Sequence, residues 1–391
     1  MTMIGAEERA AMRGLLRSVS EDLGAPVSPG WESAFWGVPR HAFLPETVWV
    51  GDDLEECSRS SAPAEWLRWA YADAPVVTQV NDGLEAEAGD RWASCSASAP
   101  SIVFRMLDLL DVQPGHRVLE IGTGTGWNAG LLSHRVGSDL VSTVEVDPML
   151  SGRAARSLKA LGLEPDVVCG DGAFGAWSRH HFDRVMATCS VRSVPAAWVD
   201  QAVPGGVILL PWESPWFCFG LLRLIVDGHG VASGSFLPHS AFMPMRQQRV
   251  NLRIFRDVVR DEHVPAESHT EVDPRWLAGG NWSAMFALGL LLPRVWHTWH
   301  ENPDVDGVTQ RLWLATTDAT SWAAVDWDGT SRDRFTVWQH GPVNLWDMAE
   351  AAYLWWSNAG KPGPERFGMT VDADGTHTPW LDSPDRPVPR L

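Results

Sequence analysis

The chain has 391 residues, of which 45% are hydrophobic and 20% are charged, so it is long enough for one large domain or two and has a globular composition. Its formal net charge of −18 argues against broad binding to nucleic acid or to an anionic membrane, because their phosphates would be repelled. Small molecules or peptides are the partners that this charge favours.

The five cysteines are scattered and contain no C-x-x-C pair, which predicts reduced thiols and no zinc or disulfide framework. The first residues, MTMIGAEERAAMRGLL, carry charges where a signal peptide needs an apolar core, and no apolar run is long enough to span a membrane. We therefore expect a cytoplasmic protein that binds neither a metal nor a membrane.

Residues 1–75 are expected to form an N-terminal segment of helices and loops. A helix is predicted over residues 6–23, ended by Gly24, and a short helix around WLRWAY. The segment VPRHAFLPETVWV is predicted to be an ordered loop, and a strand is expected from Val76 to Val80. A helix follows within residues 94–112, with Pro100 in its first turn and Ser98 as a candidate cap.

The stretch RVLEIGTGTGWN, residues 117–128, places an apolar strand before glycines at every second position and then a helix. Glycine accepts a positive φ and lets the backbone approach a ligand closely. Taken alone, the loop fits NAD, FAD, S-adenosylmethionine or a plain tight turn, whereas the absent Walker lysine argues against nucleoside triphosphates. Glu145 ends the next apolar run, where an acidic side chain can accept both ribose hydroxyls.

From residue 117 onward, strands and helices alternate, which predicts a parallel sheet covered by helices. The expected helices are 127–136, 148–161 and PAAWVDQAV; the expected strands are 140–146, DVVCG, HFDRVMATCS and GGVILLPW. Ligand-binding loops then lie at the carboxyl ends of the strands, where Gly122, Glu145, Asp171 and Thr188 fall. Asp171 could accept the adenine amine, although an Asp-Gly turn explains it as well.

After about residue 225 the pattern changes, and we expect a C-terminal α+β domain over residues 226–391. A helical stretch is predicted over residues 276–299, a strand-turn-strand over 311–329, an amphipathic helix over 344–360 and a hairpin with an Asp-Gly turn over 366–382. His297 and His300 lack a metalloprotease context and are expected to be ordinary residues. Many of the 23 tryptophans lie in this half, and an exposed subset could bind a peptide.

Several segments in order resemble the protein-L-isoaspartate O-methyltransferases. They are PRHAFLPE, SASAPSIVFRMLDLLDVQPGHRVLEIGTGTGWNAGLLSHRVG, STVEVDP, GDG and DRVMATCSVRSVPAAWVDQAVPGGVILLPW, and together they cover about residues 30–212. The resemblance implies a Rossmann-like class I methyltransferase core, here residues 76–225, that uses S-adenosylmethionine to methylate a peptide carboxylate. The cofactor-binding residues it implies are Glu120, Gly122, Thr123, Gly124, Gly126, Glu145, Val146, Asp171, Gly172 and Thr188.

The resemblance is weaker on the acceptor side. Ser96-Ala97-Ser98 stands where the family usually has Thr-Ile-Ser, and Thr188-Cys189-Ser190 stands where an alanine-rich segment is common. These departures and the C-terminal extension resemble the homologues in lanthipeptide and graspetide pathways, which esterify an aspartate of a modified precursor peptide so that it closes to an aspartimide. Ser98, with Ser96, is the expected acceptor-binding residue. Isoaspartyl repair, methylation of another small molecule, and a non-catalytic S-adenosylmethionine-binding module are the alternatives.

Overall fold

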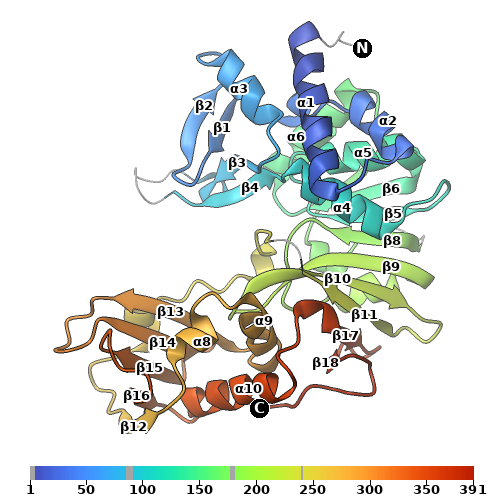
Figure 1. Ribbon diagram of the computed structural model, residues 1–391. Helices are drawn as coiled ribbons and strands as arrows, with labels where there is room; N and C mark the ends of the chain where they lie inside the picture. The colour runs from blue at the N-terminus through green and yellow to red at the C-terminus, as the bar shows by residue number, and fades with distance from the viewer. Residues whose placement is uncertain (1–4, 85–90, 177–180, 239–240) are drawn as a thin grey trace. The chain divides into compact units, whose positions relative to one another are not determined.

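The computed structural model describes residues 5–84, 91–176, 181–238 and 241–391, and they form two compact units (Figure 1). The first unit contains residues 1–189, 195–209 and 224–232, and the second contains residues 190–194, 210–223 and 233–391. The chain crosses between the units five times, and the expected boundary between residues 225 and 226 falls inside the strand Cys218–Val226.

The N-terminal segment contains three helices and part of a small sheet. The helices are α1 (Ala6–Leu23), α2 (Pro29–Gly37) and α3 (Pro63–Ala70). The sheet has the order β2-β1-β3-β4, with β1 at Thr47–Val50, β2 at Glu55–Ser58, β3 at Val76–Val80 and β4 at Ala93–Ala97. The two helices expected from sequence are confirmed. Strands β1, β2 and β4 were missed. Strand β1 lies in the segment VPRHAFLPETVWV, for which the loop prediction was wrong, whereas β2 (EECS) and β4 (ASCSA) lack the large apolar residues that indicate a strand.

The strand–helix alternation predicted after residue 117 is confirmed. The strands are β5 (Val118–Ile121), β6 (Val141–Glu145), β7 (Asp166–Cys169), β8 (Phe182–Ala187) and β9 (Ala202–Glu213). The helices are α4 (Pro100–Leu110), α5 (Trp127–Val136), α6 (Pro148–Ala160) and α7 (Ala196–Asp200). Strand β5 pairs in parallel with both β6 and β8, so the order in which successive strands are added to the sheet reverses at β5, and a ligand crevice is expected at its carboxyl end.

The same sheet continues through strands that come later in the chain. Its full order is β18-β17-β11-β10-β9-β8-β5-β6-β7, with β10 at Cys218–Val226, β11 at Ala232–Leu237, β17 at Phe367–Val371 and β18 at His377–Leu381. Strands β17 and β18 pair antiparallel, which confirms the predicted hairpin, and Gly375 in its turn has a φ of 82°.

The second unit holds a five-stranded sheet with the order β12-β16-β15-β14-β13. These strands are β12 (Ala266–Thr270), β13 (Val295–Glu301), β14 (Gln310–Thr316), β15 (Trp322–Trp327) and β16 (Phe335–His340). Its helices are α8 (Pro274–Ala278), α9 (Trp282–Leu291) and α10 (Leu345–Asn358). The predicted strand-turn-strand and final helix are confirmed. The helical prediction over 276–299 is wrong at its end, because Val295–Glu301 pairs with β14.

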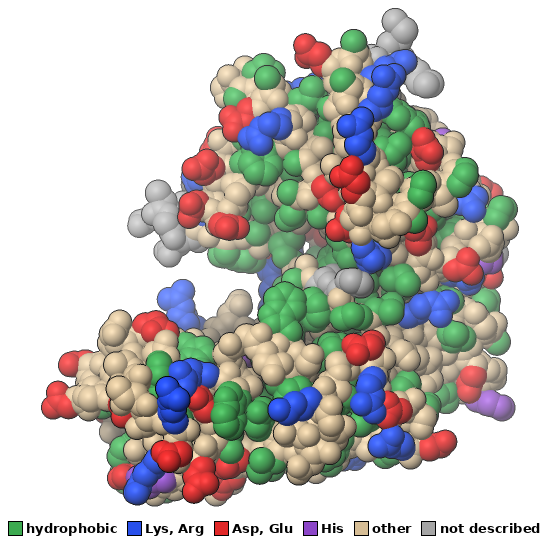
Figure 2. Space-filling model, viewed as in Figure 1, with side chains coloured by type: hydrophobic (Ala, Val, Ile, Leu, Met, Phe, Trp, Pro, Cys, Tyr) green, Lys and Arg blue, Asp and Glu red, His purple; other side chains and the backbone are tan. Residues whose placement is uncertain are grey.

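Many large aromatic side chains are buried in the core, and a few are exposed. Trp66, Trp198, Trp346 and Trp356 are almost fully buried, whereas Trp276 is 48% and Trp282 is 56% exposed. On the face drawn in Figure 2, acidic and basic side chains are interspersed rather than gathered by sign. Within the described residues, no helix is both long and apolar enough to cross a membrane.

Candidate active site

The glycine-rich turn after β5 has the backbone conformation that its sequence predicts. Gly122, Gly124 and Gly126 have φ values of 97°, 53° and 89°, which L side chains rarely adopt. A Cβ on Gly122 would lie 2.8 Å from the Thr188 Oγ1 atom. Thr188 donates from that hydroxyl to the Gly122 carbonyl at 2.5 Å. Thr188 therefore fixes the loop from the end of the neighbouring strand, and only glycine fits between them.

Glu145 lies at the carboxyl end of β6, as predicted, and its side chain is largely buried. Its Oε2 accepts a hydrogen bond from the Gly124 amide at 2.8 Å, and its Oε1 accepts from the Asp147 amide at 3.0 Å. The carboxylate is thus held against the glycine loop. Each oxygen has a second lone pair, so the same carboxylate can also accept the hydroxyls of a ribose.

Glu120 is fully buried and lies beneath the loop. Its Oε1 accepts from Asn128 Nδ2 at 2.7 Å and its Oε2 accepts from the Thr143 hydroxyl at 2.6 Å; Thr143 is also 2.6 Å from the Thr123 hydroxyl. Burial raises the pKa of Glu120 to about 7. Because solvent does not reach this carboxyl, we assign it a positioning role: it joins β5, β6 and α5 under the loop.

Asp171 begins the short 3₁₀ turn η4 (Gly172–Phe174) after β7. Its Oδ1 accepts from the Ala173 amide at 2.9 Å, so the turn interpretation is correct for one oxygen. Its Oδ2 has no donor among the described residues and can accept an adenine amine. Gly172 is buried and Val146 half-buried, so both belong to the walls beside these carboxylates.

The acceptor candidates lie on and just after β4, which approaches the glycine loop. A Cβ on Gly124 would lie 3.5 Å from Cys95 Sγ and 3.9 Å from the Ser96 carbonyl oxygen. Ser96 and Ser98 are half-buried, and neither hydroxyl has a hydrogen-bond partner among the described residues. The structure therefore brings this segment to the loop with two hydroxyls available.

Ser98 does not cap helix α4, contrary to one sequence interpretation. The N-cap is Ala99, which makes no side-chain capping bond. An amide of the first turn is instead satisfied by Asp73, whose Oδ1 accepts from the Ser101 amide at 2.8 Å. Pro100 has no backbone N–H that needs an acceptor, so the Ser98 hydroxyl has no capping role at this helix.

Arg40 is the site residue whose role sequence reasoning missed. It lies in the 3₁₀ turn η1 (Arg40–Phe43), is fully buried, and its guanidinium donates to five backbone carbonyls, those of Ala70, Ala72, Ala74, Ala97 and Ser98, at 2.9–3.2 Å. Burial lowers its pKa to about 10, which leaves it charged at neutral pH. Arg40 thereby fixes the backbone that presents Ser98. The sequence feature that could have pointed to Arg40 is the segment PRHAFLPE, which resembles the family and contains this arginine.

A second missed contact involves Gln79 on β3. Its amide nitrogen donates to Asp147 Oδ2 at 2.9 Å, and its oxygen accepts from the Ser94 hydroxyl at 3.0 Å. Asp147 caps α6 directly after Val146. This chain of bonds ties β3 and β4 to the carboxyl end of β6, so the segment that carries Ser96 and Ser98 is linked to the strand that ends in Glu145.

Comparisons with known proteins agree with this geometry. The family model described as protein-L-isoaspartate(D-aspartate) O-methyltransferase matches residues 35–227. A protein-L-isoaspartate O-methyltransferase from Pyrococcus horikoshii is 38% identical over 215 residues, which cover 55% of this chain and 83% of that protein. A protein of the same name from Azorhizobium caulinodans is 39% identical over 149 residues, which cover 38% of this chain and 67% of that protein. The chain belongs to this family.

Membership of the protein-L-isoaspartate O-methyltransferase family makes the chain an S-adenosylmethionine-dependent carboxyl methyltransferase with the class I fold. A solved structure named protein-L-isoaspartate O-methyltransferase is similar with a TM-score of 0.56 at 21% identity, over 95% of this chain and 100% of that one. The fold likeness thus includes the C-terminal part. The site fits the cofactor, because the glycine cradle excludes any Cβ at Gly122 and carboxylates end two adjoining strands.

The remaining residue predictions concern metals and thiols. Within the described ranges, no group of three or more histidine, cysteine or acidic side chains could hold a metal ion. All five cysteines are free thiols. His297 is an internal residue whose Nε2 lies 3.0 Å from the Trp216 carbonyl oxygen, and His300 packs against Phe255.

Proposed function

We propose that the enzyme methylates the side-chain carboxylate of an aspartate in a modified, ribosomally made peptide, and that the ester then closes to an aspartimide. The observation that carries this proposal is the acceptor segment, which approaches the glycine loop through Cys95 and Ser96 and in which neither the Ser96 nor the Ser98 hydroxyl has a partner among the described residues. The family reaction on a peptide carboxylate supports it.

Glu145, Asp171 and the glycine loop would hold the cofactor, which supplies an electrophilic methyl group on a sulfonium when bound. Glu145 would accept from the ribose hydroxyls and Asp171 from the adenine amine, while the glycine amides approach the remainder. An aspartate with a pKa near 3.9 is already anionic at neutral pH, so these residues need not remove a proton. Their contribution is to bind, orient and exclude water.

Ser98 would donate its hydroxyl proton to one oxygen of the acceptor carboxylate and leave the other oxygen to form the new bond to the methyl carbon. Arg40 holds the Ser98 carbonyl at 3.0 Å, so the serine backbone is fixed before substrate arrives. The methyl ester that results has an electrophilic carbonyl carbon. The next backbone nitrogen of the peptide then attacks this carbon and the bond to the methoxy group breaks. The methoxy group takes the proton from that nitrogen and leaves as methanol, which closes the five-membered aspartimide ring.

We base the preference for a modified peptide over a damaged protein on the departures from the usual family sequence, and one of these departures has a structural counterpart in the core. At Thr188-Cys189-Ser190, the hydroxyl of Ser190 donates to buried Glu213 at 2.6 Å, and Glu213 accepts from Arg192 Nε at 2.7 Å. An alanine-rich segment could not form this group. The C-terminal part is weaker support than its sequence suggested, because a structure named for the repair family matches 95% of this chain.

The second candidate is repair of L-isoaspartyl sites, and the names of the relatives favour it. One experiment separates the two. The enzyme is incubated with S-adenosylmethionine and either an isoaspartyl peptide or a macrocyclic peptide containing an unmodified aspartate, and products are followed by mass spectrometry. Methyl gain followed by methanol loss on the macrocycle alone supports the proposal, whereas turnover of the isoaspartyl peptide alone contradicts it and supports repair.

A further inference from the structure

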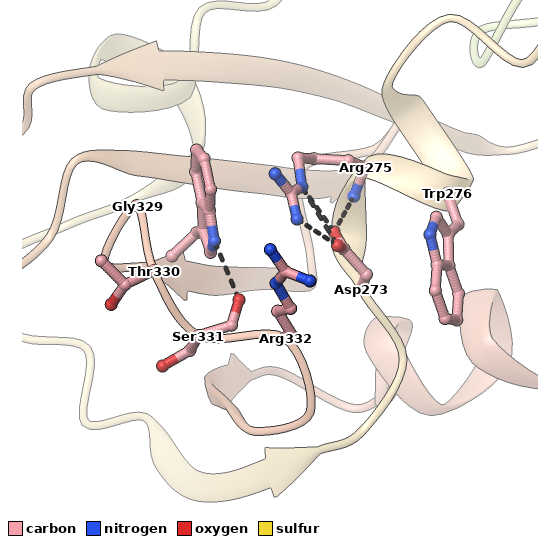
Figure 3. A pocket seen from close by; sticks show the side chains of 8 residues that line it. Asp273, Arg275, Trp276, Gly329, Thr330, Ser331 and Arg332 are labelled. Carbon is pink, nitrogen blue, oxygen red and sulfur yellow. Dashed lines mark hydrogen bonds and ion pairs between the residues drawn. The ribbon is translucent and has the colours of Figure 1, made fainter.

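The second unit contains a pocket that the methyltransferase site does not use (Figure 3). It has a volume of about 580 Å³, within the range of small-ligand sites. It lies between the turn that joins β15 to β16 and the start of α8. The lining residues are Asp273, Arg275, Trp276, Trp327, Gly329, Thr330, Ser331 and Arg332.

One wall of the pocket is a fixed stack of an arginine on a tryptophan. The Arg275 guanidinium lies 4.0 Å from the centre of the Trp327 ring and forms an ion pair with Asp273. The Asp273 side chain is only 6% exposed, so its charge is committed to Arg275. Trp327 donates its indole proton to the Ser331 carbonyl at 3.2 Å. This wall is rigid and nearly neutral.

The opposite wall presents an arginine whose charge is not paired. Arg332 extends into the pocket toward Asp273 and Arg275 (Figure 3), is exposed, and has no ion pair or hydrogen bond among the described residues. Its turn is held by Asp328, whose Oδ1 accepts from the amides of Thr330 at 2.7 Å and Ser331 at 2.6 Å. These bonds hold the pKa of Asp328 well below its usual range. The guanidinium is therefore presented on a preorganised loop.

Trp276 adds an exposed aromatic surface beside this arginine. It is 48% exposed and stacks on Tyr353 at 5.9 Å between ring centres, so its ring is oriented before any ligand arrives. Among the lining side chains, two guanidinium groups outnumber one carboxylate in a chain of net charge −18, and the Asp328 carboxylate on the same turn accepts from the amides of Thr330 and Ser331. An acidic ligand repelled by the general surface would be attracted here.

We propose that this pocket binds an acidic segment of the peptide substrate, with an aspartate or glutamate on Arg332 and a neighbouring apolar or aromatic side chain against Trp276. Arginine binds carboxylates through two parallel hydrogen bonds, and a tryptophan ring gives a large contact at little entropic cost. The pocket would thus select peptides by a segment other than the one methylated. This inference rests on the proposed peptide substrate.

The test measures binding without the cofactor, so it reads no methyl transfer. Two fluorescein-labelled hexapeptides are titrated with the full chain by fluorescence anisotropy, one with Asp-Phe-Glu at its centre and one with Asn-Phe-Gln. The acidic peptide should bind at least about tenfold more tightly, and Arg332→Glu should weaken its binding by about tenfold or more. Arg334→Glu is the matched control, because Arg334 is also exposed on this turn but does not line the pocket.

Equal binding of the two peptides, or equal loss with Arg332→Glu and Arg334→Glu, would overturn the assignment. So would an Arg332-dependent affinity for single-stranded oligothymidylate with none for the acidic peptide, which would indicate a phosphate site. Each of these results leaves the methylation experiment on the macrocycle unaffected. Conversely, if the acidic peptide binds as expected while the macrocycle is not methylated, the assignment of the pocket is supported and the proposed methylation substrate is wrong.

Discussion

The two units use charged side chains differently. In the first unit, Arg40 and Glu120 are fully buried, and they bond to backbone and to neighbouring side chains around the cofactor loop. Arginines lie over tryptophan rings in both units, Arg40 over Trp127 at 5.6 Å and Arg275 over Trp327 at 4.0 Å, so the difference is exposure: the Arg275 side chain in the second unit is 39% exposed and pairs with Asp273. A buried charge fixes geometry, whereas an exposed cation beside an aromatic ring can bind a partner. The difference suits chemistry in one unit and recognition in the other.

Replacing Arg40 should give the largest loss of stability among these variants. The substitution tests whether this buried charge holds the first unit together. Arg40→Ala leaves five carbonyls without their donor, and we expect it to reduce the free energy of unfolding by about 3–5 kcal/mol. Urea unfolding followed by circular dichroism measures this loss. Arg68→Ala is the control, since the Arg68–Glu65 pair is exposed and should contribute less than about 1 kcal/mol. Equal losses would show that Arg40 is not a structural anchor.

Glu120 predicts how the first unit responds to pH. Its pKa is raised from 4.5 to about 7 by burial, so between these values the folded state keeps a proton that the unfolded state has released. Stability should therefore fall as pH rises from about 4.5 to 7, by on the order of 3 kcal/mol, and then level off. Glu120→Gln should remove this dependence in calorimetric scans. A variant with an unchanged pH profile would show that the carboxyl is not a buried acid.

His297 predicts the opposite sign in the second unit. Burial lowers its pKa from 6.5 to about 4, so between these values the unfolded state binds a proton that the folded state refuses. Its contribution to stability should be complete above pH 6.5 and should fall by on the order of 3 kcal/mol as pH drops to about 4. His297→Gln keeps a donor for the Trp216 carbonyl and should flatten this acid limb. If the acid limb persists in that variant, another group causes it.

Glu145 tests the cofactor side of the first unit alone. Glu145→Ala removes the carboxylate that faces the loop, so affinity for S-adenosylmethionine should fall by roughly ten- to a hundredfold in calorimetry, the value of one or two charge-assisted hydrogen bonds. Glu164→Ala changes an exposed carboxylate in the same unit and should leave the affinity unchanged. Unchanged affinity in Glu145→Ala would refute the ribose assignment.

The sequence predicted the parts of the site that depend on backbone geometry. Gly122 and Glu145 were found because positive φ and strand ends leave a spaced pattern in the chain. The role of Arg40 was not found, because its partners are backbone carbonyls between residues 70 and 98. A backbone carbonyl can accept whatever side chain its residue carries, so these partners leave no pattern in the sequence. The pocket around Arg332 was missed for a related reason: it joins a turn and a helix start that only strand pairing in the second unit brings together.

Ser98 gives the smallest expected effect and separates acceptor binding from cofactor binding. Ser98→Ala removes one hydroxyl that has no structural partner among the described residues, so the fold and the affinity for S-adenosylmethionine should be retained. Turnover of the peptide should fall by about fivefold to tenfold, the value of one hydrogen bond to a carboxylate in the transition state. Ser101→Ala, in the first turn of α4, is the control, because the bond from Ser101 to Asp73 uses its backbone amide. A matched loss of cofactor affinity would place Ser98 with the glycine loop rather than with the acceptor.

Binding of the acidic hexapeptide should be unaltered in Ser98→Ala, because the proposed pocket for that peptide lies in the second unit alone.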